Sequence, residues 1–585
     1  MRADGLQVAG RPDIPDGTSP ASHNEDHRKA VRDTLSSGVA LGLAARAGYL
    51  LTRFLIPPFV LAHIGLEAYG LWATTFILVS YVGISTLGMS NVYIKYIAEY
   101  AARREFKRAN QLLSTGLTIT IPLSAAIYIA LHLSWSHVAS SLHIAPALQR
   151  DAHEVVLTVV GIFLASISLS AFRDALTGMQ CMATVQGTWV VAYLLETALI
   201  VVLVAAGRGI RGLSEAFLVR TVFEIATAMY FAFRRMPWLR LSPRLSSREA
   251  LRTIWSFGGI SQVSSLVAIA LSSIERALAV PLIGLQAAGL LDIAKKLPGM
   301  AAAIPGAFSS SLLPAASFLH SGLKGEAQGA AVKKLYLKGA RYMNLAAGFI
   351  CGPLATLPGP MLAVWLGRAY PGATLLMVVF AISMQTHMMT GPGTSLLKGL
   401  GRPKEEFRYC LPNILALLIA LPLARLITGA WTSVGIGVAV AASTLIAAVW
   451  FIRHANREFG IPAGQYARYV LWPGALPYLA GLLFLWPATV LTAGVSRWRG
   501  AVALAFIGFA YSSLLALVID RFVLDKGERL WFRAIAASKF EQIKGRMAGL
   551  RDRATKPLAA EEPAACSVSR HREFNDDEGK VYESS

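Results

Sequence analysis

The chain has 585 residues, of which 55% are hydrophobic and only 15% are charged, and its formal net charge is +21. Soluble globular proteins carry about 25% charged residues, so this composition excludes an ordinary soluble enzyme and predicts that most of the chain lies in lipid. The four cysteines, at positions 181, 351, 410 and 566, are far apart and form no CxxC pair, so the sequence indicates no metal site, no cofactor and no disulfide framework.

The first 35 residues are hydrophilic and lack the apolar core of a cleavable signal peptide. We therefore expect residues 1–35 to form a disordered cytoplasmic tail. The first membrane span would then act as its own targeting signal.

Blocks of about 20 apolar residues, the length that crosses a bilayer, recur along the rest of the chain. They predict an all-α, polytopic membrane protein with about 14 transmembrane helices. The blocks lie near 38–62, 70–92, 113–133, 155–178, 184–206, 213–233, 254–276, 286–318, 342–366, 371–396, 409–428, 432–452, 469–492 and 500–520.

Most of the 55 lysines and arginines fall in segments that would face the same side of the membrane. By the positive-inside rule, this distribution predicts that both termini are cytoplasmic. One of these segments carries Lys333, Lys334, Lys338 and Arg341. We expect such segments to contact anionic lipids rather than nucleic acid.

The sequence repeats itself at an offset of 219 residues. Residues 64–72 (IGLEAYGLW) and 283–291 (IGLQAAGLL) agree at six of nine positions. The repeat predicts two six-helix lobes, 36–253 and 254–468, related by a pseudo-twofold axis along the membrane normal, with the substrate path between them. Residues 469–520 would add two transmembrane helices, 521–556 an amphipathic cytoplasmic helix, and 557–585 a disordered tail.

The predicted loops are too short to hold a catalytic domain, and the sequence contains neither GxxxxGK[ST] nor HExxH. The chain is therefore predicted to be a transporter rather than an enzyme.

Ionisable side chains inside the predicted spans are the candidate site residues, because such groups are costly in lipid unless they are paired or functional. Arg46 and Arg53 are seven residues apart, so they share one face of the first span, where they could bind a phosphate. Alternatively, each could extend to the nearer membrane surface. Glu196 has no sequence-local partner and is either a counter-ion for an arginine or a proton-coupling site. Arg220 and Glu224 are four residues apart and are expected to pair.

Five further charged residues belong to the seventh and eighth spans. Glu275 and Arg276 fall at the outer end of the seventh span, either solvated at the interface or at the mouth of a cavity. Asp292, Lys295 and Lys296 lie deep in the eighth span, where one lysine is expected to pair with Asp292 and the other to face a water-filled path. Cationic residues outnumber acidic ones by three within the predicted spans. This excess predicts an anionic cargo.

Several stretches follow the pattern of a known family: Thr52-Arg53, Ile64 to Trp72, Leu87 to Asn91, Lys95, Ala98-Glu99, Trp365-Leu366-Gly367 with Tyr370, and Gly399 to Lys404. In these stretches the chain resembles the polysaccharide transporter (Wzx-type oligosaccharide flippase) family of the multidrug/oligosaccharidyl-lipid/polysaccharide exporter superfamily, over roughly residues 36–460. It departs from the family at Thr86, where many relatives carry Asp, so a coupling role is not carried over to that position.

The resemblance implies a two-lobed, V-shaped bundle that works by alternating access in the bacterial inner membrane. Its cargo would be an oligosaccharide linked to undecaprenyl pyrophosphate, flipped from the cytoplasmic to the periplasmic leaflet for export of capsule, exopolysaccharide or O-antigen. Arg53, Arg276 and Lys295 would contact the cargo, with Arg46 following on the same helix face and Lys296 beside Lys295. A proton or a sodium ion is the candidate coupling ion, and the candidate coupling or counter-ion residues are Glu196, Arg220, Glu224 and Asp292.

Two other functions remain open. An ion-coupled drug or metabolite antiporter of the same superfamily would need an acidic first lobe that receives cations, whereas the first two spans hold arginine and no acid. A flippase for a lipid-linked peptidoglycan precursor would suit the two extra spans but fits the motifs less well.

Overall fold

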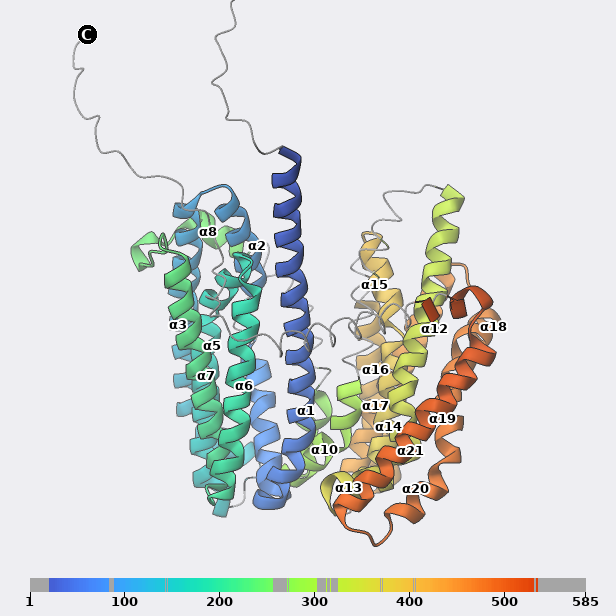
Figure 1. Ribbon diagram of the computed structural model, residues 1–585. Helices are drawn as coiled ribbons and strands as arrows, with labels where there is room; N and C mark the ends of the chain where they lie inside the picture. The colour runs from blue at the N-terminus through green and yellow to red at the C-terminus, as the bar shows by residue number, and fades with distance from the viewer. Residues whose placement is uncertain are drawn as a thin grey trace, which may run out of the picture. The chain divides into compact units, whose positions relative to one another are not determined.

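A computed structural model of the protein describes residues 20–83, 89–142, 146–255, 273–301, 325–368, 372–402, 407–530 and 533–534, and the single residues 144, 271, 312, 316, 370 and 405. Within these ranges, the side chains of residues 20–47, 147 and 407 are not described. Every regular element in the described ranges is helical, which confirms the predicted all-α class (Figure 1).

The helices of the first half of the chain are α1 (Pro20–Val82), α2 (Met89–Ala102), α3 (Phe106–Leu133), α4 (Trp135–Ser141), α5 (Gln149–Gly178), α6 (Met182–Ala205), α7 (Gly209–Arg235) and α8 (Arg248–Thr253). The second half contains a helical segment over 273–282, then α10 (Leu285–Ala301), α12 (Gly325–Thr356), α13 (Pro358–Leu366), α14 (Ala373–Met388), α15 (Gly391–Gly399), α16 (Phe407–Thr428) and α17 (Ser433–Glu458). They are followed by α18 (Ala463–Tyr466), α19 (Trp472–Leu483), α20 (Leu485–Thr492) and α21 (Arg497–Val518).

Hydroxyl side chains start some of these helices by satisfying backbone groups that have no partner within the helix. Thr432 precedes α17, and its side-chain oxygen accepts a hydrogen bond from the backbone N–H of Gly435 at 3.0 Å. Ser247 precedes α8 and accepts from the N–H of Glu249 at 3.2 Å.

The chain divides into two compact units, Met1–Ala516 and Leu517–Ser585. The described part of the second unit holds a π-helical turn, Ile519–Val523, and an ion pair between Arg533 and Asp520 at 3.2 Å. Residues 535–556, most of the predicted amphipathic helix, and the predicted tail 557–585 lie outside the described residues.

Ten helices in the described part of the chain are long and apolar enough to cross a membrane. The bent pair of α12 and α13, which meet at 82°, would make eleven. Large apolar side chains are exposed on such helices, including Phe509 at 75% and Leu426 at 80%. A surface of this kind suits lipid rather than water. The protein is therefore a polytopic membrane protein.

The predicted count of 14 spans is not confirmed. The first predicted span, 38–62, and the start of the second, residues 70–82, lie in α1 on either side of a kink at the non-helical Gly65. The predicted seventh and eighth spans, 254–276 and 286–318, are only partly described. Pro298 lies inside α10, whereas Pro305 and Pro314, which predicted a break in the eighth span, lie outside the described residues.

The internal repeat has a counterpart in the backbone. Gly65 and Gly284 are equivalent in the repeat, and both have a positive φ, 79° and 124°, which glycine adopts without strain. The helices that follow the two glycines pack against each other so closely that a methyl group on Gly70 would overlap the carbonyl oxygen of Leu285. A methyl group on Gly289 would lie 2.8 Å from the carbonyl oxygen of Leu66.

These two contacts are reciprocal, because Gly289 is the repeat equivalent of Gly70 and Leu285 is that of Leu66. Reciprocal contacts between equivalent residues are what a twofold axis produces. The geometry thus agrees with the predicted pseudo-twofold relation between the two halves.

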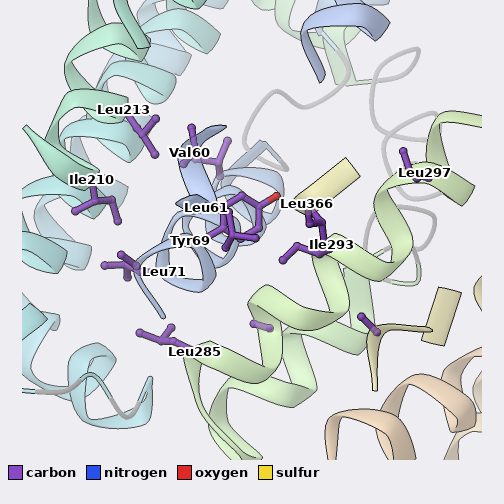
Figure 2. Packing of buried hydrophobic residues seen from close by; sticks show 14 of the residues in the cluster. Val60, Leu61, Tyr69, Leu71, Ile210, Leu213, Leu285, Ile293, Leu297 and Leu366 are labelled. Atoms are coloured by element: carbon purple, nitrogen blue, oxygen red, sulfur yellow. The ribbon is translucent and has the colours of Figure 1, made fainter. Parts of the chain in front are cut away.

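A buried cluster joins the two halves of the chain next to this contact. In Figure 2, side chains of α1 such as Leu61 and Leu71 lie between Ile210 and Leu213 of α7 on one side and Ile293 of α10 on the other. Since lipid is as apolar as these side chains, close packing rather than the hydrophobic effect holds helices together within a bilayer. The small residues Gly70 and Gly289 permit that packing.

One inward-facing cation was predicted wrongly. Arg341 was expected to contact anionic lipids, but it lies within α12 with only 2% of its surface exposed. Its guanidinium carbon is 4.4 Å from the ring centre of Tyr469. Arg341 therefore belongs to the packed interior, where an arginine can stack on an aromatic face.

Candidate functional site

A cavity of about 700 Å³ opens between the two halves of the chain. The parts of α1 before and after Gly65 line it, together with α6, α10, Leu213 of α7 and Arg276 of the 273–282 segment. Six of the nine predicted site residues are in its wall: Arg53, Glu196, Arg276, Asp292, Lys295 and Lys296.

Arg53 and Lys296 lie at equal distances along the chain from the two turn glycines of the repeat. Arg53 and Lys296 are each twelve residues from a turn glycine of the repeat, Gly65 and Gly284. At 1.5 Å per residue, both side chains begin about 18 Å from that end of the helices.

Asp292 is the centre of a buried network on the α10 side. It accepts hydrogen bonds from the Arg276 guanidinium at 2.7 Å, the Lys296 ammonium at 2.9 Å and the Tyr69 hydroxyl at 2.8 Å. The pairing of Asp292 with a lysine four residues later confirms the prediction from helical spacing. The bond from Tyr69 links α1 to α10, so the network also connects the two halves of the chain.

Lys295 has a carboxylate partner that the sequence did not indicate. Its ammonium group donates to Glu275 at 2.8 Å, and the Glu275 side chain is fully buried. Interfacial solvation of Glu275, one of the two predicted alternatives, is therefore wrong. Lys295 and Lys296 both line the cavity, although only one of them was expected to do so.

A second charged group belongs to the first half of the chain. Arg220 of α7 lies 3.1 Å from Glu224, which confirms the predicted pair, and 3.3 Å from Glu196 of α6. The guanidinium carbon of Arg220 is also 4.9 Å from the ring centre of Tyr193. Glu196 is thus placed as a counter-ion of Arg220, and its alternative role in proton coupling stays a prediction.

Arg53 is held differently from the other cations. Its guanidinium carbon is 5.1 Å from the ring centre of Tyr49, and within the described ranges no carboxylate oxygen lies within 4 Å of it. A cation over an aromatic face remains available to an anion. The predicted partner of Arg53 in a phosphate ladder, Arg46, lies on the described backbone of α1, but its side chain is outside the described part.

The charge balance is less positive than predicted. Around the cavity, five cations face four carboxylates: Arg53, Arg220, Arg276, Lys295 and Lys296 against Glu196, Glu224, Glu275 and Asp292. The surplus is one positive charge rather than three. The difference comes from two cations: Arg425 is exposed beside Trp431, and the side chain of Arg46 is not described and is left out of the count.

Two residues of the network were missed at the sequence level. Tyr69 is 3% exposed, and the repeat gave no signal for it, because the equivalent residue in the second copy is Ala288. Ser273 supports the site by accepting a hydrogen bond from Arg276 at 3.0 Å. It carries no charge, so a search for intramembrane charges could not find it.

No protein-family model matches the chain. The chain is 22% identical over 510 residues to the uncharacterized membrane protein EpsK of Bacillus subtilis strain 168, and the match covers 85% of this chain and 97% of that protein.

Among solved structures, lipid II flippase MurJ in an inward closed conformation gives a TM-score of 0.59 at 10% identity, covering 83% of this chain and 98% of MurJ. An inward-facing multidrug resistance MATE family transporter of the MOP superfamily gives a TM-score of 0.54 at 14% identity, covering 72% of this chain and 98% of that transporter. The chain therefore has the fold of these two proteins, which are transport proteins rather than enzymes.

Proposed function

We propose that this membrane protein flips an oligosaccharide linked to undecaprenyl pyrophosphate from the cytoplasmic to the periplasmic leaflet of a bacterial inner membrane. It would do so by alternating access, for export of a capsule, exopolysaccharide or O-antigen. Both termini would be cytoplasmic, and a proton or sodium gradient would drive the cycle.

The observation that carries the proposal is the cationic wall of the cavity between the two halves. Four cations line it, Arg53, Arg276, Lys295 and Lys296, against two lining carboxylates. A guanidinium binds phosphate oxygens through two parallel hydrogen bonds, and an ammonium group adds a point charge. A diphosphate headgroup would therefore find several donors in one place.

The same residues link cargo binding to the contact between the two halves. Asp292 neutralises Arg276 and Lys296 and also accepts the hydrogen bond from Tyr69 across that contact. An anionic headgroup would compete with Asp292 for the two cations. Cargo binding would thus be coupled to whether the hydrogen bond between Tyr69 and Asp292 is formed, as alternating access requires.

A drug or metabolite antiporter of the same superfamily is the first alternative, since a MATE transporter shares the fold. Such a protein needs carboxylates that can receive a cationic substrate. In the first half of this chain, Glu196 and Glu224 are both held by Arg220. This arrangement favours an anionic cargo over a cationic one.

A flippase for a lipid-linked peptidoglycan precursor is the second alternative, supported by the likeness to lipid II flippase MurJ. A cargo of that type also carries a diphosphate, so the cavity charges do not distinguish it from the proposed one.

The test is to delete the gene and identify the lipid-linked glycan that accumulates on the cytoplasmic side. An accumulated surface-polysaccharide intermediate supports the proposal. An accumulated peptidoglycan precursor would favour the second alternative, and altered resistance to cationic drugs with no accumulation would favour the first.

Site variants refine this test. Arg53→Ala should abolish export while protein abundance stays near normal, and Lys295→Ala should abolish export at a lower abundance, because it leaves the buried Glu275 without its hydrogen-bonded cation. The matched control is Arg425→Ala, because Arg425 is exposed at the end of α16 and away from the cavity. If export survives both cavity substitutions, these side chains do not contact the cargo.

A further inference from the structure

A second cavity of about 540 Å³ adjoins the charged one. Helices α5, α6 and α7 line it, and Tyr49 and Leu50 of α1 line both cavities. Pockets that bind small molecules typically measure about 300–1,000 Å³. The second cavity is thus large enough for a ligand group and has a wall in common with the cationic site.

Its polar side chains have hydrogen-bonding capacity to spare. Ser166 and Ser170, one helical turn apart on α5, line it together with Gln186 of α6. Within the described ranges no hydrogen bond is recorded for these three side chains. Glu224 also lines the cavity, and Arg220 contacts only one of its two carboxylate oxygens. The cavity therefore offers two hydroxyls, an amide, a carboxylate oxygen and the guanidinium of Arg173 to a ligand.

Aromatic rings form part of the wall next to these groups. The ring centres of Trp189 and Tyr49 are 5.6 Å apart, and that of Trp189 is 4.5 Å from Tyr193. Trp189 and Phe231 line the second cavity, Tyr193 lines the first, and Tyr49 lines both. The aromatic group thus stands at the boundary between the two cavities.

This combination suits a sugar. A pyranose ring has an apolar face of C–H groups that packs on an aromatic ring, and an edge of hydroxyls that needs donors and acceptors. A hydrocarbon tail would use only the aromatic and aliphatic wall. It would leave Ser166, Ser170 and Gln186 without partners, at about 1–3 kcal/mol for each group left unsatisfied.

We propose that this second cavity binds the sugar attached directly to the cargo's diphosphate, while the cationic cavity binds the diphosphate itself. The inference rests on the function proposed above. Trp189 supplies the stacking face, and the hydroxyl, amide and carboxylate groups of α5, α6 and α7 select for a hydroxyl-rich ligand. The two cavities adjoin in the protein as the sugar and the diphosphate adjoin in the cargo.

The experiment measures binding of two probes to the purified full-length chain: undecaprenyl diphosphate, and undecaprenyl diphosphate carrying one N-acetylglucosamine. The wild-type protein should bind the sugar-bearing probe about tenfold more tightly. Trp189→Leu and Gln186→Leu should each remove most of that difference and leave the affinity for undecaprenyl diphosphate within about twofold. Trp486→Leu is the matched control, because Trp486 is 74% exposed on α20.

Each result has one meaning. If both probes bind equally well to the wild-type protein, the sugar site is wrong and the diphosphate site stands. If Trp189→Leu and Gln186→Leu weaken both probes equally, the cavity holds the lipid tail or supports the fold, and the sugar site is again wrong. If neither probe binds the wild-type protein, the proposed function itself fails.

Discussion

Close approach of two backbones joins the two halves of this protein, and replacing Gly70 with alanine tests it. A methyl group at this position would overlap the carbonyl oxygen of Leu285. Because that oxygen belongs to the backbone of α10, no rotation of a side chain can make room. Gly70→Ala should therefore force α1 and α10 apart at this contact.

The expected effect follows from the cost of overpacking. Inserting a methyl group into a well-packed interior costs about 1–3 kcal/mol. If only the conformation with α1 against α10 bears this cost, its population relative to a separated conformation falls about 5- to 150-fold. An equilibrium between two transport states would respond visibly to a change of this size.

The assay is a distance measurement between two nitroxide labels by pulsed electron paramagnetic resonance. His63→Cys and Gln286→Cys provide label sites, since both positions are exposed and each is two residues from a turn glycine of the repeat. The four native cysteines must first be replaced. The wild-type protein should give a short distance, and Gly70→Ala should shift the distribution to longer distances.

Gly508→Ala on α21 is the control, because an added methyl group there meets nothing within 4 Å. The control should leave the distance distribution unchanged. Coinciding distributions for Gly70→Ala and the wild type would refute the proposed close contact, as would an equal shift for Gly508→Ala.

Three further substitutions probe the charged network. Tyr69→Phe removes the hydrogen bond to the Asp292 carboxylate, worth about 1.5–3 kcal/mol, and should lengthen the distance between the labels at positions 63 and 286. An unchanged distance distribution would show that this bond does not hold α1 to α10. Glu275→Gln removes a buried charge partner of Lys295 and should lower the free energy of unfolding in detergent by up to about 3 kcal/mol. The double variant Glu275→Gln with Lys295→Met should recover part of this loss. A loss under about 0.5 kcal/mol, which is typical of a surface substitution, would contradict the buried pair. Arg220→Leu should lower the thermal midpoint more than Arg220→Lys, because only leucine leaves two adjacent carboxylates without a cation; equal midpoints would argue against the triad.

Helical periodicity predicted the local part of the site. The spacing of Asp292 and Lys296, and that of Arg220 and Glu224, places each pair on one helix face, and both pairs form. Such pairs depend only on the geometry of one helix. The positions of the charges in apolar blocks were likewise enough to pick out the six charged residues of the cavity wall.

Contacts between distant elements could not be predicted in the same way. Tyr69 and Asp292 are 223 positions apart, and Lys295 reaches Glu275 from a different helical segment. Both contacts depend on how helices pack, which a single sequence does not determine. The burial of Glu275 and its contact with Lys295 were missed for this reason.

The predicted count of 14 spans stays a prediction, because the seventh and eighth predicted spans are only partly described. The chain kinks at the non-helical Gly65, between the first two predicted spans. The internal repeat did identify Gly65 and Gly284 as equivalent, and both have a positive φ.

The central claim is that the cavity cations bind a diphosphate headgroup, and a comparison of two lipids tests it most directly. Purified protein in nanodiscs would be titrated with undecaprenyl diphosphate and with uncharged undecaprenol. We predict that undecaprenyl diphosphate binds at least about tenfold more tightly, and that Arg53→Ala removes most of this preference while Arg425→Ala does not. Equal affinity for the two lipids, or a preference that survives Arg53→Ala in full, would contradict the account.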